Sequence, residues 1–134
     1  MLNPMAMPQL LADKTVLIIE DEMLIAMDVE QIANDLGARH VLVLRVREAL
    51  RHMLENVVSP DVCFVDYRSA DGERRSVAEF FGSTGGKLIV MTTDGDPEKD
   101  PLVANADAVL RKPFGAEEVG QAFRDALGAR SNDT

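Results

Sequence analysis

Short apolar runs alternate with longer amphipathic segments along most of this chain. The runs span residues 15–19, 40–44, 62–65, 88–91 and 108–110, and each is rich in Val, Ile or Leu. Apolar runs this short, bounded by polar or turn-forming residues, are typical of strands buried on both faces of a parallel sheet. The pattern therefore predicts five buried strands.

Helical spacing of apolar residues predicts the connections between these strands. Apolar stripes predict three helices, over about residues 25–36, 46–57 and 116–127, and a weaker helix is expected at about 75–81. The segment after the fourth strand contains Gly95, Pro97 and Pro101, which interrupt helices. A fourth helix is therefore expected to be short or disordered.

Alternation of strand and helix places this chain in the α/β class. Five such repeats with short connections predict a doubly wound, five-stranded parallel sheet with right-handed crossovers and helices on both faces. A length of 134 residues suits one domain. We expect an N-terminal extension at 1–13, the domain at 14–128 and a C-terminal tail at 129–134.

Charge and composition narrow the range of functions. The chain has 23 acidic and 14 Lys or Arg residues, a net charge of −9, which disfavours direct binding to nucleic acid. The N-terminal stretch is broken by Pro4 and Pro8 and has no basic residue before Lys14, unlike a signal peptide or a membrane span. The single cysteine, Cys63, lies in an apolar run, as expected of a core thiol in a reducing compartment. A cytoplasmic protein without a membrane partner is predicted.

Side chains that could bind a metal or take part in catalysis lie at or just after the ends of four predicted strands. Glu20 and Asp21 follow the first strand, Asp66 ends the third, Thr92 follows the fourth, and Lys112 comes after the fifth. Parallel strands bring such residues to one edge of the sheet. Each has an ordinary alternative role, as a turn residue, a helix N-terminus or a strand residue.

Carboxylates gathered at one edge repel each other, so either their pKa values rise or a cation joins them. Oxygen ligands without a His or Cys cluster favour Mg²⁺. A carboxylate near Mg²⁺ can attack a phosphoryl group, whose charge the Lys112 ammonium and the Thr92 hydroxyl would then stabilise.

Four motifs, in order, resemble the receiver domains of bacterial two-component response regulators. They are Val-Leu-Ile-Ile-Glu-Asp-Glu at 16–22, Asp66 at a strand end, the threonine after Leu-Ile-Val-Met, and Lys-Pro-Phe at 112–114. The resemblance runs from about Lys14 to Leu127. It implies a flavodoxin-like sheet with strand order 2-1-3-4-5.

The resemblance also implies roles for individual residues. Asp66 would be the phosphoacceptor and a ligand of Mg²⁺, Asp21 a direct ligand, and Glu20 a ligand acting through metal-bound water. The backbone carbonyl of Arg68 would complete the metal site. Lys112 would pair with the phosphoryl group.

The switch hydroxyl implied by the resemblance has two candidates. Thr92 is preferred because it directly ends the apolar run, and Thr93 is the alternative.

Three departures from the receiver pattern affect these expectations. The loop after Asp66 lacks the common proline and carries Arg68, which we hypothesise changes the lifetime of the phosphoryl group. Val109 stands where many receivers have an aromatic residue that moves with the threonine. The weak fourth helix and the residues Glu-Asp-Glu at 20–22 are similar to those of a receiver subgroup marked by the motif Phe-Ala-Thr-Gly. Members of that subgroup are often partnered with an unusual class of histidine kinase. Met-Thr-Thr-Asp at 91–94 matches the motif only approximately.

The function implied by the resemblance is that of a stand-alone receiver, phosphorylated by a sensor histidine kinase or a phosphotransfer protein. It would act by binding an unidentified downstream protein or as a phosphate sink, and a homodimer is left open. It would not be an enzyme beyond self-phosphorylation from small donors and autodephosphorylation. A second hypothesis is a phosphorylation-independent interaction module. A phosphatase or nucleotide-binding enzyme is weaker, because no Gly-rich phosphate loop is present.

Overall fold

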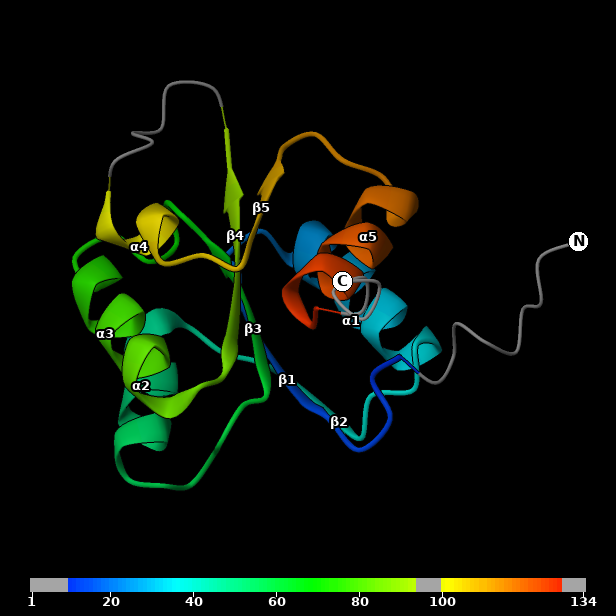
Figure 1. Ribbon diagram of the computed structural model, residues 1–134. Helices are drawn as coiled ribbons and strands as arrows, with labels where there is room; N and C mark the ends of the chain where they lie inside the picture. The colour runs from blue at the N-terminus through cyan, green and yellow to red at the C-terminus, as the bar shows by residue number, and fades with distance from the viewer. Residues whose placement is uncertain (1–9, 94–99, 129–134) are drawn as a thin grey trace, which may run out of the picture.

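Five parallel strands form one sheet in the order β2-β1-β3-β4-β5, as the computed structural model shows for residues 10–93 and 100–128 (Figure 1). The strands are β1 (Thr15–Ile19), β2 (His40–Val43), β3 (Val62–Asp66), β4 (Lys87–Thr92) and β5 (Ala108–Arg111). The helices are α1 (Met23–Asp35), α2 (Val46–Leu54), α3 (Arg74–Thr84), α4 (Pro101–Ala104) and α5 (Ala116–Ala126). The predicted α/β fold class and strand order are confirmed.

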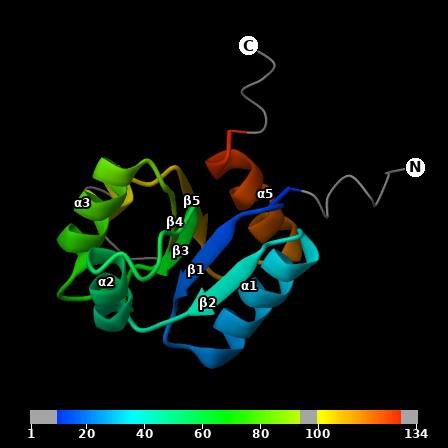
Figure 2. The same cartoon turned by 90° about the horizontal axis from the view of Figure 1, so that it is seen from below.

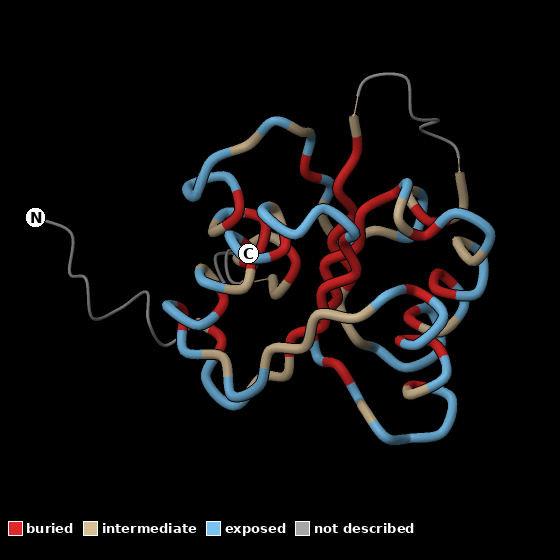
Figure 3. The backbone as a smooth tube through the Cα atoms, turned by 180° about the vertical axis from the view of Figure 1, so that it is seen from behind, coloured by how far each residue is buried: buried red, intermediate tan, exposed pale blue. Residues whose placement is uncertain are grey.

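The helices cover both faces of the sheet. Helices α1 and α5 lie on one face, while α2, α3 and α4 lie on the other (Figures 1 and 2). The central strands run through the buried middle of the molecule (Figure 3). Side chains in a strand alternate between faces, so β1, β2, β3 and β4 each contribute to both apolar clusters, while β5 contributes to the cluster on the α1 and α5 face.

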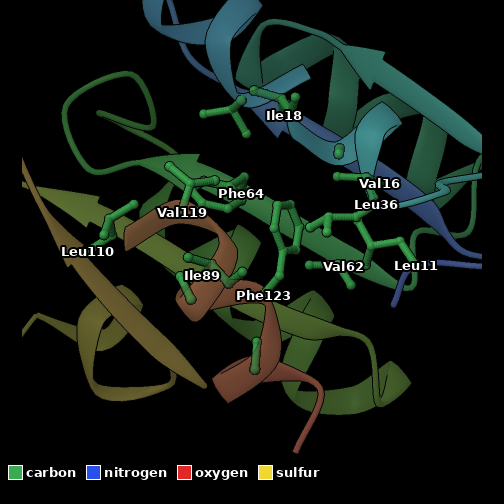
Figure 4. Packing of buried hydrophobic residues seen from close by; sticks show 14 of the residues in the cluster. Leu11, Val16, Ile18, Leu36, Val62, Phe64, Ile89, Leu110, Val119 and Phe123 are labelled. Carbon is green, nitrogen blue, oxygen red and sulfur yellow. The ribbon is translucent and has the colours of Figure 1, made fainter. Parts of the chain in front are cut away.

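The central strand β3 is buried along its whole length. On the α1 and α5 face, Phe64 packs against Phe123 of α5, with ring centroids 5.0 Å apart (Figure 4). Both side chains are fully buried. Asp66 lies two residues beyond Phe64, so the packing of β3 fixes where this carboxylate emerges.

Helix α2 ends earlier than the apolar spacing predicts. It stops at Leu54, and the backbone then turns at Asn56, which has φ of 60°. Leu54 and Val57 are consequently 72% and 64% exposed instead of lining the helix–sheet interface. The predicted apolar stripe is correct only as far as Met53.

Helix α4 is a single turn of four residues, which confirms the expected short fourth helix. Asp100 caps it, because one oxygen of this carboxylate accepts the Leu102 N–H at 2.8 Å. Leu102 is fully buried and anchors the turn. The preceding residues 94–99, including Gly95 and Pro97, lie outside the described residues.

The predicted domain boundaries stay predictions. Residues 1–9 of the expected extension and the expected tail at 129–134 lie outside the described residues. Leu11, within the expected extension, is fully buried and donates its N–H to the Leu36 carbonyl at 2.9 Å. Among the described helices, none has the length and apolar character needed to cross a membrane.

Candidate functional site

The carboxyl ends of β1, β3 and β5 bring together the residues expected to converge. Glu20 follows the last residue of β1, Asp66 is the last residue of β3, and Lys112 follows the last residue of β5. They line a cavity of about 360 Å³. The full set of lining residues is Glu20, Asp21, Glu22, Asp66, Arg68, Ser69, Thr93 and Lys112.

The Lys112 ammonium sits among three carboxylates. Its Nζ lies 2.8 Å from Asp66 Oδ1, 2.9 Å from Glu20 Oε1 and 3.5 Å from Glu22 Oε1. The Lys112, Glu20 and Asp66 side chains are only 12%, 1% and 8% exposed. The contacts of Lys112 with Glu20 and Asp66 are therefore poorly screened by solvent, and they join the ends of three strands.

Burial and charge shift the pKa values of this cluster. Burial raises the pKa of Glu20 above its ordinary value, and the nearby Asp66 charge raises it further. Hydrogen bonds from the Glu22 N–H and from Lys112 lower this pKa but do not cancel the rise. Burial alone would lower the pKa of Lys112, but its hydrogen bonds to Asp66 and Glu20 and their charges outweigh that effect and raise it. Lys112 therefore remains a cation in this site.

Asp21 and Arg68 stand at the rim of the cavity. The Asp21 side chain is 48% exposed and lies 3.8 Å from the Arg45 guanidinium. Arg68 is exposed, and its carbonyl accepts the Asp71 N–H at 3.1 Å. A carbonyl oxygen has two lone pairs, so this hydrogen bond leaves it able to bind a second partner.

Ser69 is a site residue that was not predicted from the sequence. Its backbone N–H and its hydroxyl both donate to Asp66 Oδ2, each at 2.9 Å. Serine within three residues of a turn aspartate is a signal for such local hydrogen bonding, because short polar side chains often bond to neighbouring backbone and turn groups.

The two candidate threonines occupy different positions. Thr92 ends β4 and is buried, and its carbonyl accepts the Lys112 N–H at 2.7 Å. Alternation along β4 places its side chain on the same face as Val90, toward α2 and α3. Thr93 instead lines the cavity. The choice of switch hydroxyl stays a prediction, and the geometry places Thr93 at the cavity.

The donor set suits a hard divalent cation. Four of the residues that line the cavity are acidic, and carboxylate oxygens are the ligands that Mg²⁺ prefers. In the described conformation, several carboxylate oxygens face Lys112 or a backbone N–H. Across residues 10–93 and 100–128, no three acidic, His or Cys side chains form a closed metal-binding group. The residue types fit Mg²⁺.

Tyr67 connects the site to α4. Tyr67 is 5% exposed, and its ring lies beneath the Arg74 guanidinium, whose carbon is 3.7 Å from the ring centroid. Its hydroxyl donates to the second carboxylate oxygen of Asp100 at 3.2 Å, so Asp100 is held both by Tyr67 and by the start of α4. The residue next to Asp66 is thus tied directly to the α4 turn.

We expect Tyr67→Phe to loosen α4. The change removes one partly buried hydrogen bond but keeps the ring beneath Arg74, so we expect a loss of about 1 kcal/mol in unfolding free energy. Hydrogen exchange at the Leu102–Ala104 amides should accelerate more than exchange in α5. Unchanged exchange in α4 would show that the Tyr67 hydroxyl does not hold it.

Comparison with solved structures identifies what this fold is similar to. No family model matches the sequence, and no curated protein matches it. Among solved structures, a response regulator receiver domain protein from Clostridium thermocellum is 25% identical, with TM-score 0.71 over 90% of this chain and 99% of that one. The response regulator PhyR from Brucella abortus is 25% identical with TM-score 0.69; the match covers 96% of this chain and 54% of PhyR.

FixJ-N gives the same fold at lower identity. It is 23% identical, with TM-score 0.67 over 85% of this chain and 93% of that one. The five-stranded parallel sheet in the order 2-1-3-4-5 and these similarities lead to one conclusion: this chain has the fold of the receiver domains of response regulators.

Proposed function

We propose that this receiver accepts a phosphoryl group on Asp66 from a histidine kinase or a phosphotransfer protein. The observation that carries the proposal is the position of Asp66, which is buried at the end of β3 with the Lys112 ammonium 2.8 Å from one oxygen. A paired carboxylate on a cavity open to solvent is accessible to a phosphoryl donor and has a cation beside it.

The transfer uses the Asp66 carboxylate as the nucleophile. One Asp66 oxygen forms a bond to phosphorus, the phosphorus–nitrogen bond of a phosphohistidine donor breaks, and its electron pair returns to the imidazole nitrogen. Lys112 moves from pairing with Asp66 to pairing with the phosphoryl oxygens, whose charge it stabilises. The product is an acyl phosphate on Asp66.

Mg²⁺ is proposed to bind through Asp21, Asp66 and the Arg68 carbonyl, with Glu20 acting through a bound water. When bound, it would neutralise charge on the phosphoryl oxygens. Supporting this assignment, all four groups lie at the carboxyl end of β3 or in the loops that follow β1 and β3. Glu20 is also the most deeply buried side chain of the acidic set, and burial raises its pKa.

The signal is proposed to leave through a change in protein–protein contacts around β4, β5 and α4. The threonines at the end of β4 are one route to this surface, and the Tyr67 to Asp100 hydrogen bond is another. Val109 does not provide the aromatic partner of many receivers, and its side chain is 51% exposed on β5. The second route is therefore the better supported in this chain.

Phosphorylation with a small donor tests the proposal. After incubation with acetyl phosphate and Mg²⁺, we expect intact mass measurement to show one phosphoryl adduct on the native protein. Asp66→Asn should show none, because the amide is not a nucleophile, and chelating Mg²⁺ should suppress the adduct. Asp35→Asn, which changes an exposed aspartate at the end of α1, should keep it.

A phosphorylation-independent interaction module is the second candidate. It is favoured by the internal pairing of Asp66, whose two oxygens already contact Lys112 and Ser69. Absence of any adduct, with acetyl phosphate and with a cognate kinase, would support this alternative and contradict the first.

A further inference from the structure

The two oxygens of the Asp66 carboxylate have different partners. Oδ1 pairs with the Lys112 ammonium at 2.8 Å, while Oδ2 accepts two hydrogen bonds from Ser69, from its backbone N–H and its hydroxyl, both at 2.9 Å. A carboxylate held from both sides cannot rotate freely about its χ2 angle. The orientation of the acceptor is therefore set by Ser69 as well as by Lys112.

The Ser69 hydroxyl also contacts the end of β1. It accepts the backbone N–H of Asp21 at 3.0 Å while it donates to Asp66 Oδ2. One hydroxyl group thus joins two strand ends, and accepting from Asp21 directs its proton toward Asp66. Alanine would remove both contacts, whereas threonine would keep the hydroxyl.

We infer that Ser69 is a positioning residue: its two hydrogen bonds to Oδ2 fix the orientation of the Asp66 carboxylate, so that Oδ1 is the oxygen that attacks phosphorus. The inference rests on the proposed phosphorylation of Asp66. This role is distinct from those implied for Arg68. It depends on the Ser69 hydroxyl and on the hydrogen bond that this hydroxyl accepts from the Asp21 N–H. Ser69 acts through Asp66 and makes no bond to phosphorus.

Two consequences of the Ser69 hydrogen bonds oppose each other in the transfer reaction. Donation to Oδ2 withdraws charge from the carboxylate, which reduces its intrinsic nucleophilicity. Phosphoryl transfer through a loose transition state depends only weakly on the basicity of the nucleophile but strongly on its alignment. Orientation should therefore dominate, and loss of the hydroxyl should slow phosphorylation.

After phosphorylation on Oδ1, the Oδ2 atom becomes the carbonyl oxygen of the acyl phosphate. The Ser69 hydroxyl then donates to this carbonyl and stabilises the carboxylate that leaves during hydrolysis. Loss of the hydroxyl should consequently slow dephosphorylation as well. Slowing of both steps distinguishes a positioning role from a simple loss of folded protein, which would lower the extent of labelling without changing the decay rate of the adduct.

The test measures phosphorylation by acetyl phosphate with Mg²⁺ and then the decay of the adduct, by intact mass. We expect Ser69→Ala to slow phosphorylation by roughly tenfold, as for the loss of a hydrogen bond to a charged group. Ser69→Thr should recover most of the native rate. Ser83→Ala is the matched control, because it removes a serine hydroxyl that bonds only locally to the Phe80 carbonyl in α3, at 3.0 Å, and should leave both rates unchanged.

The outcomes separate this inference from the proposed function. A native protein that takes no phosphoryl group overturns both. Native phosphorylation with equal rates for Ser69→Ala, or equal slowing in Ser69→Ala and Ser69→Thr, overturns only the role of the Ser69 hydroxyl. If Ser69→Ala folds incompletely, Ser69→Cys serves instead, since it preserves side-chain length with a weak donor and should also slow both steps.

Discussion

Lys112→Met is expected to destabilise the folded protein by about 3 kcal/mol, because it removes the cation from a buried group of carboxylates. Glu20 and Asp66, only 1% and 8% exposed, would lose the ammonium that lies 2.9 and 2.8 Å away. Methionine retains most of the side-chain volume, so the change isolates the charge. Urea unfolding at neutral pH measures the loss.

Two further variants identify the source of this loss. Combining Lys112→Met with Asp66→Asn should recover part of the stability, because one of the unpaired charges is removed. Lys87→Met, at the opposite end of β4, should cost less than about 1 kcal/mol. A Lys112→Met protein as stable as the native one would show that the carboxylates do not depend on this lysine.

Mg²⁺ provides an independent measurement on the same variant. Because the metal and the Lys112 ammonium neutralise the same carboxylates, Mg²⁺ should raise the unfolding midpoint of Lys112→Met more than that of the native protein. An equal effect on both proteins would place the metal away from this cluster.

Phe123→Ala is expected to cost about 3 to 5 kcal/mol, the range for truncating a fully buried aromatic side chain. Phe123 packs on Phe64 at a centroid distance of 5.0 Å, and both rings are fully buried beneath α5 (Figure 4). The resulting cavity would lie under the strand that carries Asp66. Thermal or urea unfolding measures the effect.

Phe80→Ala is the matched control for this truncation. Phe80 is partly buried in α3 and contacts the Phe81 ring edge-on at 5.2 Å. Less area is buried there, so the loss should be clearly smaller than for Phe123. Similar losses for the two variants would show that α3 and α5 contribute equally to the core.

Much of the fold was predictable because buried parallel strands have a strong sequence signature. The five apolar runs became β1 to β5 with small changes at their ends, and the described part of the segment around Pro101 forms one turn of helix. The end of α2 was not predictable from spacing. Leu54 and Val57 continue the apolar pattern, but the chain turns away at Asn56.

The site was predictable only as far as strand ends define it. Glu20, Asp66 and Lys112 converge because parallel strands finish at one edge. Thr92 and Thr93 are adjacent, so their side chains point to opposite faces, and a shift of the strand by one residue would exchange them. The apolar run does not determine which of the two faces the cavity. The hydrogen bond between the Asp21 N–H and the Ser69 hydroxyl depends on how the loops after β1 and β3 approach each other, and this tertiary feature has no local sequence signature.

The hydrogen bond between Tyr67 and Asp100 has a consequence for how sequences of this kind diverge. These residues are 33 positions apart, yet one supplies the hydroxyl and the other both caps α4 and accepts it. If the tyrosine hydroxyl were lost, position 100 would need only a residue that caps α4, and other capping residues could replace aspartate there. If Asp100 were lost first, the Tyr67 hydroxyl would lose this acceptor. In descendants of this chain, Asp100 should therefore change freely only after Tyr67 has changed, and the order of substitution would record which residue constrains the other.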